Sequence, residues 1–578
     1  MIDILKYFDE PVSQRQKQYE TVRAVVKDGL SIKAAAGRFG YKVSTVNSIL
    51  RDVRNGKLKL FPDVNKGPRQ RRTSVEIQEE ILNYRKKKFS SPQIHKQLSE
   101  AGISVSVKTI ERILTDAGFS KLKRRTFKEL GITSKNKIIP ERSAQIDFAK
   151  LKPFNIDCPA AGVFFFLPYI IESGIIDIAK NCNLPESSDI GSIQACLSML
   201  LLKLIGNERL SQMDSYDKEP GLGLFAGLNI LPKSTFMSTY SCRTSEAMLL
   251  EFQEKLIKQF INSYPQLYDG QFINLDFHSI PHFGEESEME KVWCGSRSKA
   301  MKGANTIFAQ DSGSNTLIYT RADILRKEEA EEIKRFIAFW KQVKGNVDET
   351  LVFDCNFTKY KLLDEMAEEG IKFITLRKRS KKLISDTSNI PKELWTKVNI
   401  PIPKRKYSKV SVYQDNNIVL RNCKNRFRQI IIKDNGRLKP TYIITNDKDL
   451  SISKILEVYA KRWHIENKIA EMVSFFNLNA LSSPLMIRIH FDILWTMIAD
   501  TLYHRFAQDL RRFENNKAST IFKKFINMPG RVVYDGEKFI IKIRKRSHTP
   551  ILMGVEKLNK PFAVPWLNNT TVEIVWTP

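Results

Sequence analysis

The segment YAKRWHIE, residues 459–466, places Tyr459, Arg462 and Glu466 three and four residues apart, the spacing of one helical face. A carboxylate can bind a metal ion and a guanidinium can bind a phosphate, so such a face suits phosphoryl transfer. The plain alternative is a solvated surface whose Arg462–Glu466 ion pair has little energetic weight. The segment alone leaves both interpretations open, and the other acids of the chain must decide between them.

Two further carboxylates interrupt apolar segments that are typical of strands. Asp276 lies in INLDF and Asp354 in LVFDC, where burying a charge is costly unless a cation compensates it. Carboxylate oxygens suit Mg²⁺, with Mn²⁺ as a substitute, and two such ions on three acids perform phosphoryl transfer. We therefore predict Asp276, Asp354 and Glu466 as the catalytic and metal-ligating residues, with Tyr459 and Arg462 reaching toward the phosphates of the strand that is cut.

The elements around these acids indicate how they would be positioned. From about residue 270 the periodicity predicts the order β-β-β-α-β-α-β, which is typical of a ribonuclease-H-like α/β core. In that core the first and fourth strands are neighbours, so Asp276 and Asp354 can meet. The core is expected at residues 263–380 and 451–512, the second part carrying the catalytic helix. Residues 381–450 alternate apolar and basic residues between Asp-Asn and Asn-Gly turns, which predicts a β-rich insertion.

The acids and their spacing resemble a known family. Asp276, Asp354 and Glu466 resemble the triad of the DDE transposases of bacterial insertion sequences, in the group with a Tyr-x2-Arg-x3-Glu-x6-Lys signature. Tyr459, Arg462 and Glu466 match that spacing, whereas Val473 occupies the position of the lysine. The resemblance implies an enzyme that cuts and joins DNA at insertion-sequence ends with two Mg²⁺ ions. It also implies a β insertion between the second and third acids. The insertion's cations would suit transposon-end DNA, or they would only prevent edge pairing of exposed strands; they are Lys404, Arg405, Lys406, Arg426 and Arg428.

The N-terminal quarter predicts DNA binding on separate grounds. The chain has a net charge of +29 and a pI near 9.6, and residues 1–145 hold 31 Lys and Arg against 15 Asp and Glu. Residues 1–58 read as a helix-turn-helix unit, with Ser44 capping its third helix and Val46, Ile49 and Leu50 facing inward. Such a helix presents its polar side chains to the major groove, here Lys42, Thr45, Asn47 and Arg51.

A second helix-turn-helix unit is predicted at residues 73–120. Ser91-Pro92 opens a helix, Gly102 makes the turn, and residues 107–117 form a recognition helix that exposes Lys108, Thr109 and Arg112. A basic linker at 59–72 joins the two units; it would follow a minor groove or be a solvated tether. The expected partners are double-stranded DNA, both terminal inverted repeats and target DNA, and a second copy of the chain in a synaptic homodimer.

The remaining segments complete a multidomain prediction: N-terminal all-α helix-turn-helix units, then an α/β ribonuclease-H-like core interrupted by a β-rich insertion. A basic connector is expected at 121–145, a helical region at 146–262, and a β-rich basic tail at 513–578. The apolar run from Ala161 to Ala179 is interrupted by Pro168, Glu172 and Asp177, so we expect buried core and no membrane span. Trp463 is expected to pack against the core.

Several classes of function are disfavoured. Seven scattered cysteines without a C-x-x-C pair favour a reducing cytoplasm. The resemblance to bacterial transposases implies a prokaryotic cell, with the protein on the nucleoid when it binds DNA. The sequence lacks a phosphate-binding loop, and GLGLFAG at 221–227 lacks the dinucleotide spacing, so we expect no nucleotide cofactor. His278 and His282 flank Asp276, but their spacing makes zinc the weaker interpretation.

Two alternatives to a DNA transposase stay open at this point. One is a catalytically lapsed, transposase-derived DNA-binding protein, which Val473 favours and the retention of three acids disfavours. The other is a stand-alone metal-dependent nuclease, which would have little need of two sequence-reading units.

Overall fold

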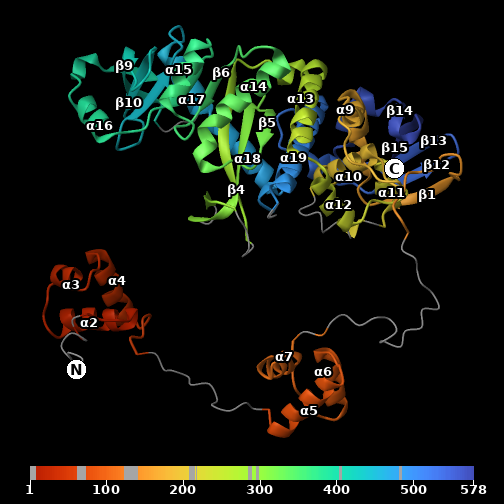
Figure 1. Cartoon of the computed structure of the whole chain (residues 1–578), viewed down its shortest axis with the longest axis horizontal. Helices are drawn as coiled ribbons and strands as arrows, with labels where there is room; N and C mark the ends of the chain where they lie inside the picture. The colour runs from red at the N-terminus through yellow and green to blue at the C-terminus, as the bar shows by residue number, and fades with distance from the viewer. Residues whose placement is uncertain are drawn as a thin grey trace. The chain divides into compact units, whose positions relative to one another are not determined.

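The computed structural model describes residues 10–61, 73–120, 141–206, 218–283, 289–294, 298–402, 407–480 and 485–578, together with Phe8, Leu122, Ser215 and Tyr216. The chain divides into two compact units, Met1–Ile138 and Ile139–Pro578 (Figure 1). The first unit is helical and the second mixes helices with two sheets.

Two sets of three helices make up the described part of the first unit. The first set is α2 (Gln14–Val26), α3 (Ile32–Arg38) and α4 (Val43–Arg54), which bury Ala36, Val46 and Leu50. The predicted inward side of the third helix is confirmed. The predicted Ser44 cap is wrong, because α4 begins at Val43 with Lys42 at the N-cap position, which puts Ser44 inside the first turn.

The second set is α5 (Val75–Lys86), α6 (Ser91–Glu100) and α7 (Val107–Asp116). Ile81, Ile94 and Ile110 lie at its centre with no exposed surface. Ser90 and Gln93 form a capping box at the start of α6, which fixes where that helix begins. Most of the expected basic linker and connector lies outside the described residues, namely 62–72, 121 and 123–140.

The main sheet of the second unit begins with the strands predicted for the core and one further strand, β3. They are β2 (Phe272–Pro281), β3 (Lys291–Cys294), β4 (Lys299–Asp311), β5 (Leu317–Arg321), β6 (Thr350–Phe353) and β7 (Phe373–Leu376). The spatial order is β3–β4–β2–β6–β7, with β5 also paired to β4. Strand β2 pairs in parallel with β6, so the predicted contact between the strands that carry Asp276 and Asp354 is confirmed. The short strand β3 was not predicted.

The segment predicted as a β-rich insertion begins with a helix, α16 (Lys381–Ser388), which the alternating pattern did not indicate. Its strands are β8 (Thr396–Asn399), β9 (Lys409–Val419), β10 (Arg426–Lys433) and β11 (Thr441–Thr445). They extend the core sheet in the order β7–β11–β10–β9–β8, because β11 pairs antiparallel with β7. One sheet therefore runs from the acid-bearing strands to the end of the insertion.

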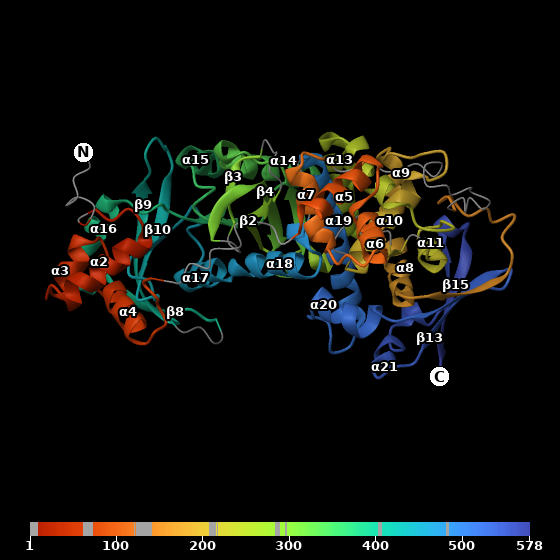
Figure 2. The same cartoon turned by 90° about the horizontal axis from the view of Figure 1, so that it is seen from below.

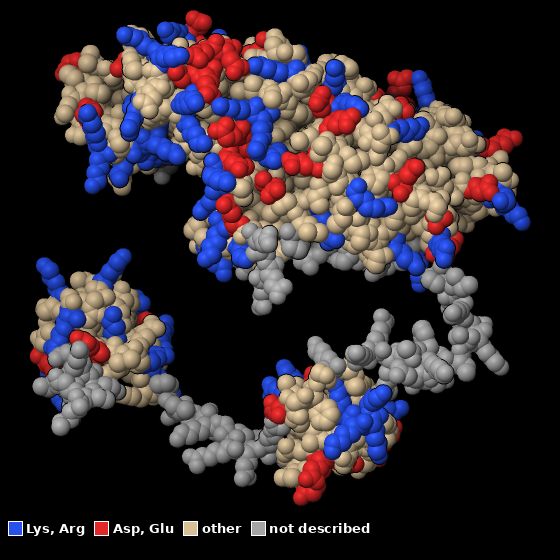
Figure 3. Space-filling model, viewed as in Figure 1, with Lys and Arg blue, Asp and Glu red and all other residues tan. Residues whose placement is uncertain are grey.

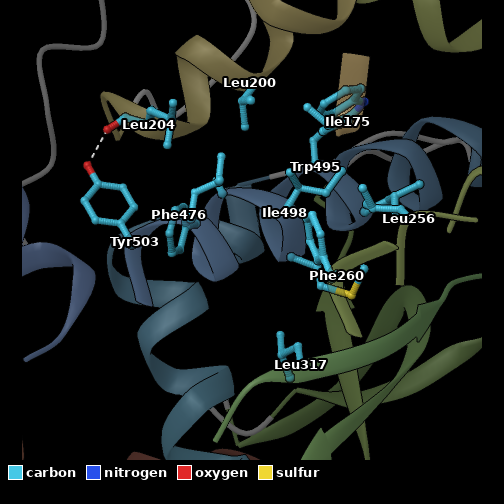
Figure 4. Close-up of a cluster of buried hydrophobic side chains, with 14 of the residues drawn as sticks. Ile175, Leu200, Leu204, Leu256, Phe260, Leu317, Phe476, Trp495, Ile498 and Tyr503 are labelled. Carbon is cyan, nitrogen blue, oxygen red and sulfur yellow. Dashed lines mark hydrogen bonds between the residues drawn. The ribbon is translucent and has the colours of Figure 1, made fainter. Parts of the chain in front are cut away.

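Helices cover this sheet. They are α14 (Glu332–Lys344), α15 (Tyr360–Glu368), α17 (Ile452–Lys461), α18 (Trp463–Ser474) and α19 (Met486–Asp509). Helices α17 and α18 follow one another along the sheet, with α17 against β7 and β8 and α18 against β2 and β4 (Figure 2). Helix α19 is largely buried, with Trp495 and Ile498 packed among Leu256, Phe260 and Leu200 (Figure 4).

Residues 146–262 were expected to be helical, and most of them are: α8 (Leu167–Glu172), α9 (Ile175–Asn181), α10 (Ser192–Leu204), α11 (Pro220–Phe225), α12 (Ser234–Tyr240) and α13 (Glu246–Ser263). The exception is strand β1 (Phe154–Cys158), which pairs with β12 (Gly530–Tyr534) of the C-terminal segment. A second sheet, β1–β12–β13–β15–β14, results, with β13 (Lys538–Arg544), β14 (Phe562–Val564) and β15 (Thr570–Thr577). The helical region and the β-rich tail thus fold together, with the short helices α20 (Ala518–Ile521) and α21 (Thr549–Leu552) beside them.

The apolar run near residue 165 is buried, as predicted: Phe164, Phe165 and Phe166 have no exposed surface. Among the described helices, none is by itself both long and apolar enough to cross a membrane. The bent pair Ala161–Glu172 and Ile175–Asn181, with 63° between its halves, meets that length and composition test only when the two are joined.

Candidate active site

Two of the predicted acids follow paired positions on neighbouring strands. Leu275 of β2 is in register with Phe353 of β6, so Asp276 and Asp354 come next on the two strands. The Asp354 carboxylate accepts a hydrogen bond of 2.7 Å from the backbone N–H of Asn356, which forms a turn directly after the end of β6. The Asp276 side chain is 16% exposed and accepts a bond of 3.0 Å from the N–H of Phe277. The sheet therefore presents two carboxylates side by side.

The junction between α17 and α18 brings the third acid to the same place. Arg462 ends α17 and immediately precedes α18, and Glu466 lies in the first turn of α18. Arg462 donates from Nη1 to Asp276 Oδ2 at 2.9 Å and from Nη2 to Glu466 Oε1 at 2.7 Å. The guanidinium also lies 5.9 Å from the ring centre of Tyr459. The structure thus gathers the five residues that the sequence analysis selected, and their catalytic role stays a prediction.

The electrostatics of the cluster show an excess of negative charge. Burial raises the pKa of Asp276 to about 6; Arg462 opposes that rise, and the nearby carboxylates of Asp354 and Glu466 add to it. Burial likewise raises the pKa of Tyr459, which keeps its hydroxyl protonated. One arginine therefore does not offset the acids that face it.

The donor set fits a hard divalent cation in its chemistry. Burial raises the pKa of Asp276, the carboxylates of Asp354 and Glu466 add to that rise, and a bound cation would offset both effects. In the arrangement seen here, however, no group of three or more His, Cys, Asp and Glu side chains within the described residues is placed to hold a metal ion. Glu466, 56% exposed, is the acid that must turn from Arg462 to complete such a group.

Two hollows adjoin the acids. A pocket of about 570 Å³ is lined by Asp276 and Glu466 together with Trp293, Arg326 and Asn356, among others. A second, of about 450 Å³, is lined by Asp354 and Glu466 on one side and by the insertion residues Asn435, Arg437 and Thr441 on another. Since Glu466 borders both, the acids lie between a core-side and an insertion-side hollow.

Sequence reasoning missed four of the residues around the acids. Arg326 lines the larger pocket, and so does Glu329, whose pKa is raised by burial and by the nearby Asp354. Trp293 and Asn356 line it too. Trp293 lies in strand β3, and Arg326 and Glu329 lie in a short 3₁₀ segment, where no periodicity marks a side chain as facing a site. Asn356 had a usable signal, because it follows an acid at the end of a predicted strand.

Two expectations about side chains near the acids need correction. Trp463 was expected to pack against the core, but it is 48% exposed and lines the insertion-side pocket, because it begins α18 at the outer side of the helix junction. Arg428 was grouped with the insertion's DNA-facing cations, yet it is 5% exposed and bonds to Gln414 Oε1 and the carbonyl of Leu450. Lys404, Arg405 and Lys406 of that group lie outside the described residues, and Arg426 is exposed.

Lysine and arginine side chains remain concentrated over the insertion. Figure 3 shows them gathered at the end of the second unit where α16, β9 and β10 lie. Lys378, Arg379, Lys381 and Lys382 are all exposed there. The described surface of this end of the second unit is therefore rich in basic side chains.

The histidines do not form the alternative zinc site in this arrangement. His278 Nε2 lies 2.8 Å from Asn479 Oδ1, and burial lowers the pKa of His278. His282 is buried at the end of β2. With the absence of a three-ligand group among the described residues, this arrangement gives zinc no support.

The predicted DNA-contact residues of the first unit lie on two helices. Lys42, Asn47 and Arg51 are exposed on or beside α4, and Thr45 is half-buried. On α7, Lys108 and Arg112 are exposed, whereas Thr109 is half-buried and its hydroxyl lies 2.9 Å from that of Ser106 at the helix cap. Thr109 is thus partly engaged in capping its own helix.

Comparison with known proteins gives the acids a context. Residues 267–502, less than half of the chain, match the family model described as "Transposase DDE domain". The match spans Asp276, Asp354 and Glu466 and supports a DDE transposase. No curated protein matches the chain.

Solved structures with some similarity are also transposases. A cryo-EM structure of the piggyBac transposase synaptic complex with hairpin DNA is 12% identical, covers 65% of this chain and 82% of that chain, and has a TM-score of 0.33. The Mos1 transposase paired-end complex with left transposon end is 8% identical, with 62% and 77% covered and a TM-score of 0.14. The Mos1 strand transfer complex is 9% identical, with 64% and 78% covered and a TM-score of 0.13. Similarity this remote does not establish a shared fold, so the family context rests on the sequence match.

Proposed function

We propose that this chain is a DDE transposase of the bacterial insertion-sequence type, with a ribonuclease-H-like core, which cuts and joins DNA strands at the element's ends. One observation carries the proposal: Asp276 and Asp354 directly follow the last paired residues of two parallel strands, and Glu466 is brought beside them by a helix that lies on the same sheet. The match to the DDE domain over residues 267–502 supports it.

The three acids would hold two divalent cations, Mg²⁺ or in its place Mn²⁺. Bound there, such ions would lower the pKa of water and neutralise charge that develops on the transferred phosphate. The chain's own contribution is position: the β2–β6 pairing fixes two carboxylates, and the α17–α18 junction sets the third. Arg462 and Arg326, one on each side of Glu466, offer guanidinium groups to phosphate oxygens.

The helical units of the first part of the chain would bind the terminal repeats. Their exposed cations Lys42, Arg51, Lys108 and Arg112 suit phosphate contacts beside a major groove. The basic insertion surface would take the DNA that leads to the acids. Recognition of two ends requires two copies of the chain, hence a homodimer in the synaptic complex.

The direct test is strand cleavage and joining with Mg²⁺ on DNA that carries the repeats flanking the gene. Wild type is compared with Asp276→Asn and Glu466→Gln. The matched control is Glu457→Gln, since Glu457 lies on α17 and pairs with Lys454 and Lys461, away from both pockets. We expect wild type and the control to cut and join, and both site variants to bind DNA without cutting it.

The outcomes separate the alternatives. Binding without cleavage by wild type would favour the lapsed DNA-binding protein, for which Val473 in place of the signature lysine is the available argument. Cleavage without joining would favour a stand-alone nuclease. Cleavage that survives loss of Glu466 would refute the assignment of the third acid.

A further inference from the structure

Arg462 joins two of the predicted metal ligands to one cation of the chain itself. Its guanidinium is 14% exposed and uses separate nitrogens for Asp276 Oδ2 and Glu466 Oε1, at 2.9 and 2.7 Å. Charge-assisted contacts of this length with two carboxylates are among the stronger polar interactions in a protein. Arg462 therefore ties Glu466 to Asp276 through its own positive charge.

The guanidinium occupies one oxygen of each of two carboxylates that a divalent cation would use. It takes up part of their capacity to bind a cation, and two cations so close would repel each other. Pairing by Arg462 and binding of a metal ion by Asp276 and Glu466 therefore compete. Movement of Arg462 to another partner should favour cation binding.

The surroundings of Arg462 allow such a movement. The residue lies at the junction between α17 and α18, and its partner Glu466 is 56% exposed. Arg462 lines the insertion-side pocket together with Arg437 and Trp463, where it would meet a phosphate group on bound DNA. A phosphate offers a guanidinium the same two-point contact that the carboxylates offer it now.

We propose that Arg462 exchanges its carboxylate partners for a DNA phosphate, and that this exchange couples DNA binding to metal binding. With Arg462 on a phosphate, Asp276 and Glu466 are free for the metal ion; with a metal ion bound, Arg462 is free for DNA. By reciprocity each ligand raises the affinity of the other by the same factor. The inference rests on the proposed function, because it takes these acids as the metal ligands.

The test measures Mn²⁺ binding to the full chain by the EPR signal of free Mn²⁺, with and without DNA. The DNA is a precleaved duplex of the element's end with a dideoxy 3′ terminus, so neither cleavage nor joining takes place. We expect DNA to raise the Mn²⁺ affinity of wild type by a factor of roughly 5 to 150, the range of known couplings. In the absence of DNA, Arg462→Gln should bind Mn²⁺ more tightly than wild type does. The factor by which DNA raises the Mn²⁺ affinity should fall toward one in this variant.

Arg437→Gln is the matched control. Arg437 is an exposed arginine of the same pocket, and the described contacts of Asp276 and Glu466 do not include it. Its loss should weaken DNA binding and leave Mn²⁺ affinity without DNA unchanged, which separates partner exchange from a general loss of positive charge. Arg462→Lys keeps the charge with less capacity to bridge two acids, so it should show a smaller gain in Mn²⁺ affinity. It replaces the glutamine variant if that protein does not fold.

Two results would overturn the exchange. One is that, when both are measured without DNA, Arg462→Gln binds Mn²⁺ no more tightly than wild type. The other is that DNA raises the Mn²⁺ affinity of Arg462→Gln as much as it raises that of wild type. Asp276→Asn reports on the proposed function separately. If wild type and Asp276→Asn bind Mn²⁺ equally, the acids are not the metal site and the proposed function fails. If Asp276→Asn loses Mn²⁺ while Arg462→Gln behaves as wild type, the function stands and only the exchange is refuted.

Discussion

A buried ion pair between α18 and α19 should be a major support of the helix that carries Glu466. Lys468 Nζ lies 2.7 Å from Asp500 Oδ1, and the two side chains are 12% and 2% exposed. Glu471 Oε2 is 3.7 Å from the same ammonium. Lys468→Met removes the cation and leaves two carboxylates in the interior, a loss that costs about 3–5 kcal/mol when a buried pair is broken in this way.

A surface pair of similar length provides the comparison. Lys334 Nζ lies 2.6 Å from Glu365 Oε2, but these side chains are 47% and 32% exposed. Lys334→Met should therefore cost about 0–1 kcal/mol, because water already screens the pair. Burial, and not distance, accounts for the difference expected between the two variants.

Thermal unfolding at pH 7 distinguishes the two variants, at about 1 °C per kcal/mol for a unit of this size. The double variant Lys468→Met with Asp500→Leu should regain much of the loss, since one of the two uncompensated charges is then gone. Burial raises the pKa of Asp500 to about 6 although Lys468 opposes the rise, so loss of Lys468 raises that pKa further. The deficit of Lys468→Met should therefore shrink as the pH falls and Asp500 takes up a proton. Equal melting temperatures for Lys468→Met and Lys334→Met, or a double variant no better than the single one, would refute the reasoning.

Three further predictions follow from other contacts. Gly162→Ala should lower the melting temperature or the soluble yield, because the added Cβ would clash with the carbonyl oxygen of Ile526. Gly37→Ala is the control and should lower neither, because an added Cβ there meets open space among the described residues. Burial lowers the pKa of His490 from 6.5 to about 4, so the free energy of unfolding is unaffected by this group above pH 6.5 and decreases as the pH falls toward 4. His490→Leu should remove up to about 3 kcal/mol of that decrease, and an unchanged pH profile would contradict this. Arg51, 68% exposed on α4, should contribute about 0.9 to the slope of log DNA affinity against log salt concentration for each phosphate that it contacts. Arg51→Gln should therefore reduce that slope, and an identical slope would show that Arg51 does not contact DNA.

The elements near the acids were predictable because local patterns specify them. Short apolar runs marked the strands of Asp276 and Asp354, and the prediction that these strands are neighbours followed from the order of elements. The spacing of Tyr459, Arg462 and Glu466 placed the three residues on one side of the α17–α18 segment. What local pattern cannot show is which partner a charged side chain selects, so the double contact of Arg462 was visible only in three dimensions.

The elements that were missed depend on contacts distant in sequence. Strand β1 forms because Ile156 pairs with Val532 of the C-terminal segment, and nothing in FNIDC alone indicates that edge. Helix α16 interrupts a segment in which charged and apolar residues alternate as they do in strands. Trp463 was expected to be buried from its residue type, yet its place at a helix junction leaves it half exposed.

The same distant contacts bear on what the C-terminal segment does. Glu471 Oε1 of α18 accepts a hydrogen bond of 2.7 Å from the backbone N–H of Ala518, and Lys468 of the same helix binds Asp500 of α19. Both contacts lie within one or two turns of Glu466. A core that stopped at residue 512, the boundary predicted from sequence, would lose the hydrogen bond from Ala518. The Glu471 carboxylate would then keep the Lys468 ammonium, 3.7 Å away, as its described side-chain partner. The predicted boundary therefore encloses α18, the helix of Glu466, but does not delimit a part that could hold Glu466 in place alone, because residues beyond 512 form one side of its support.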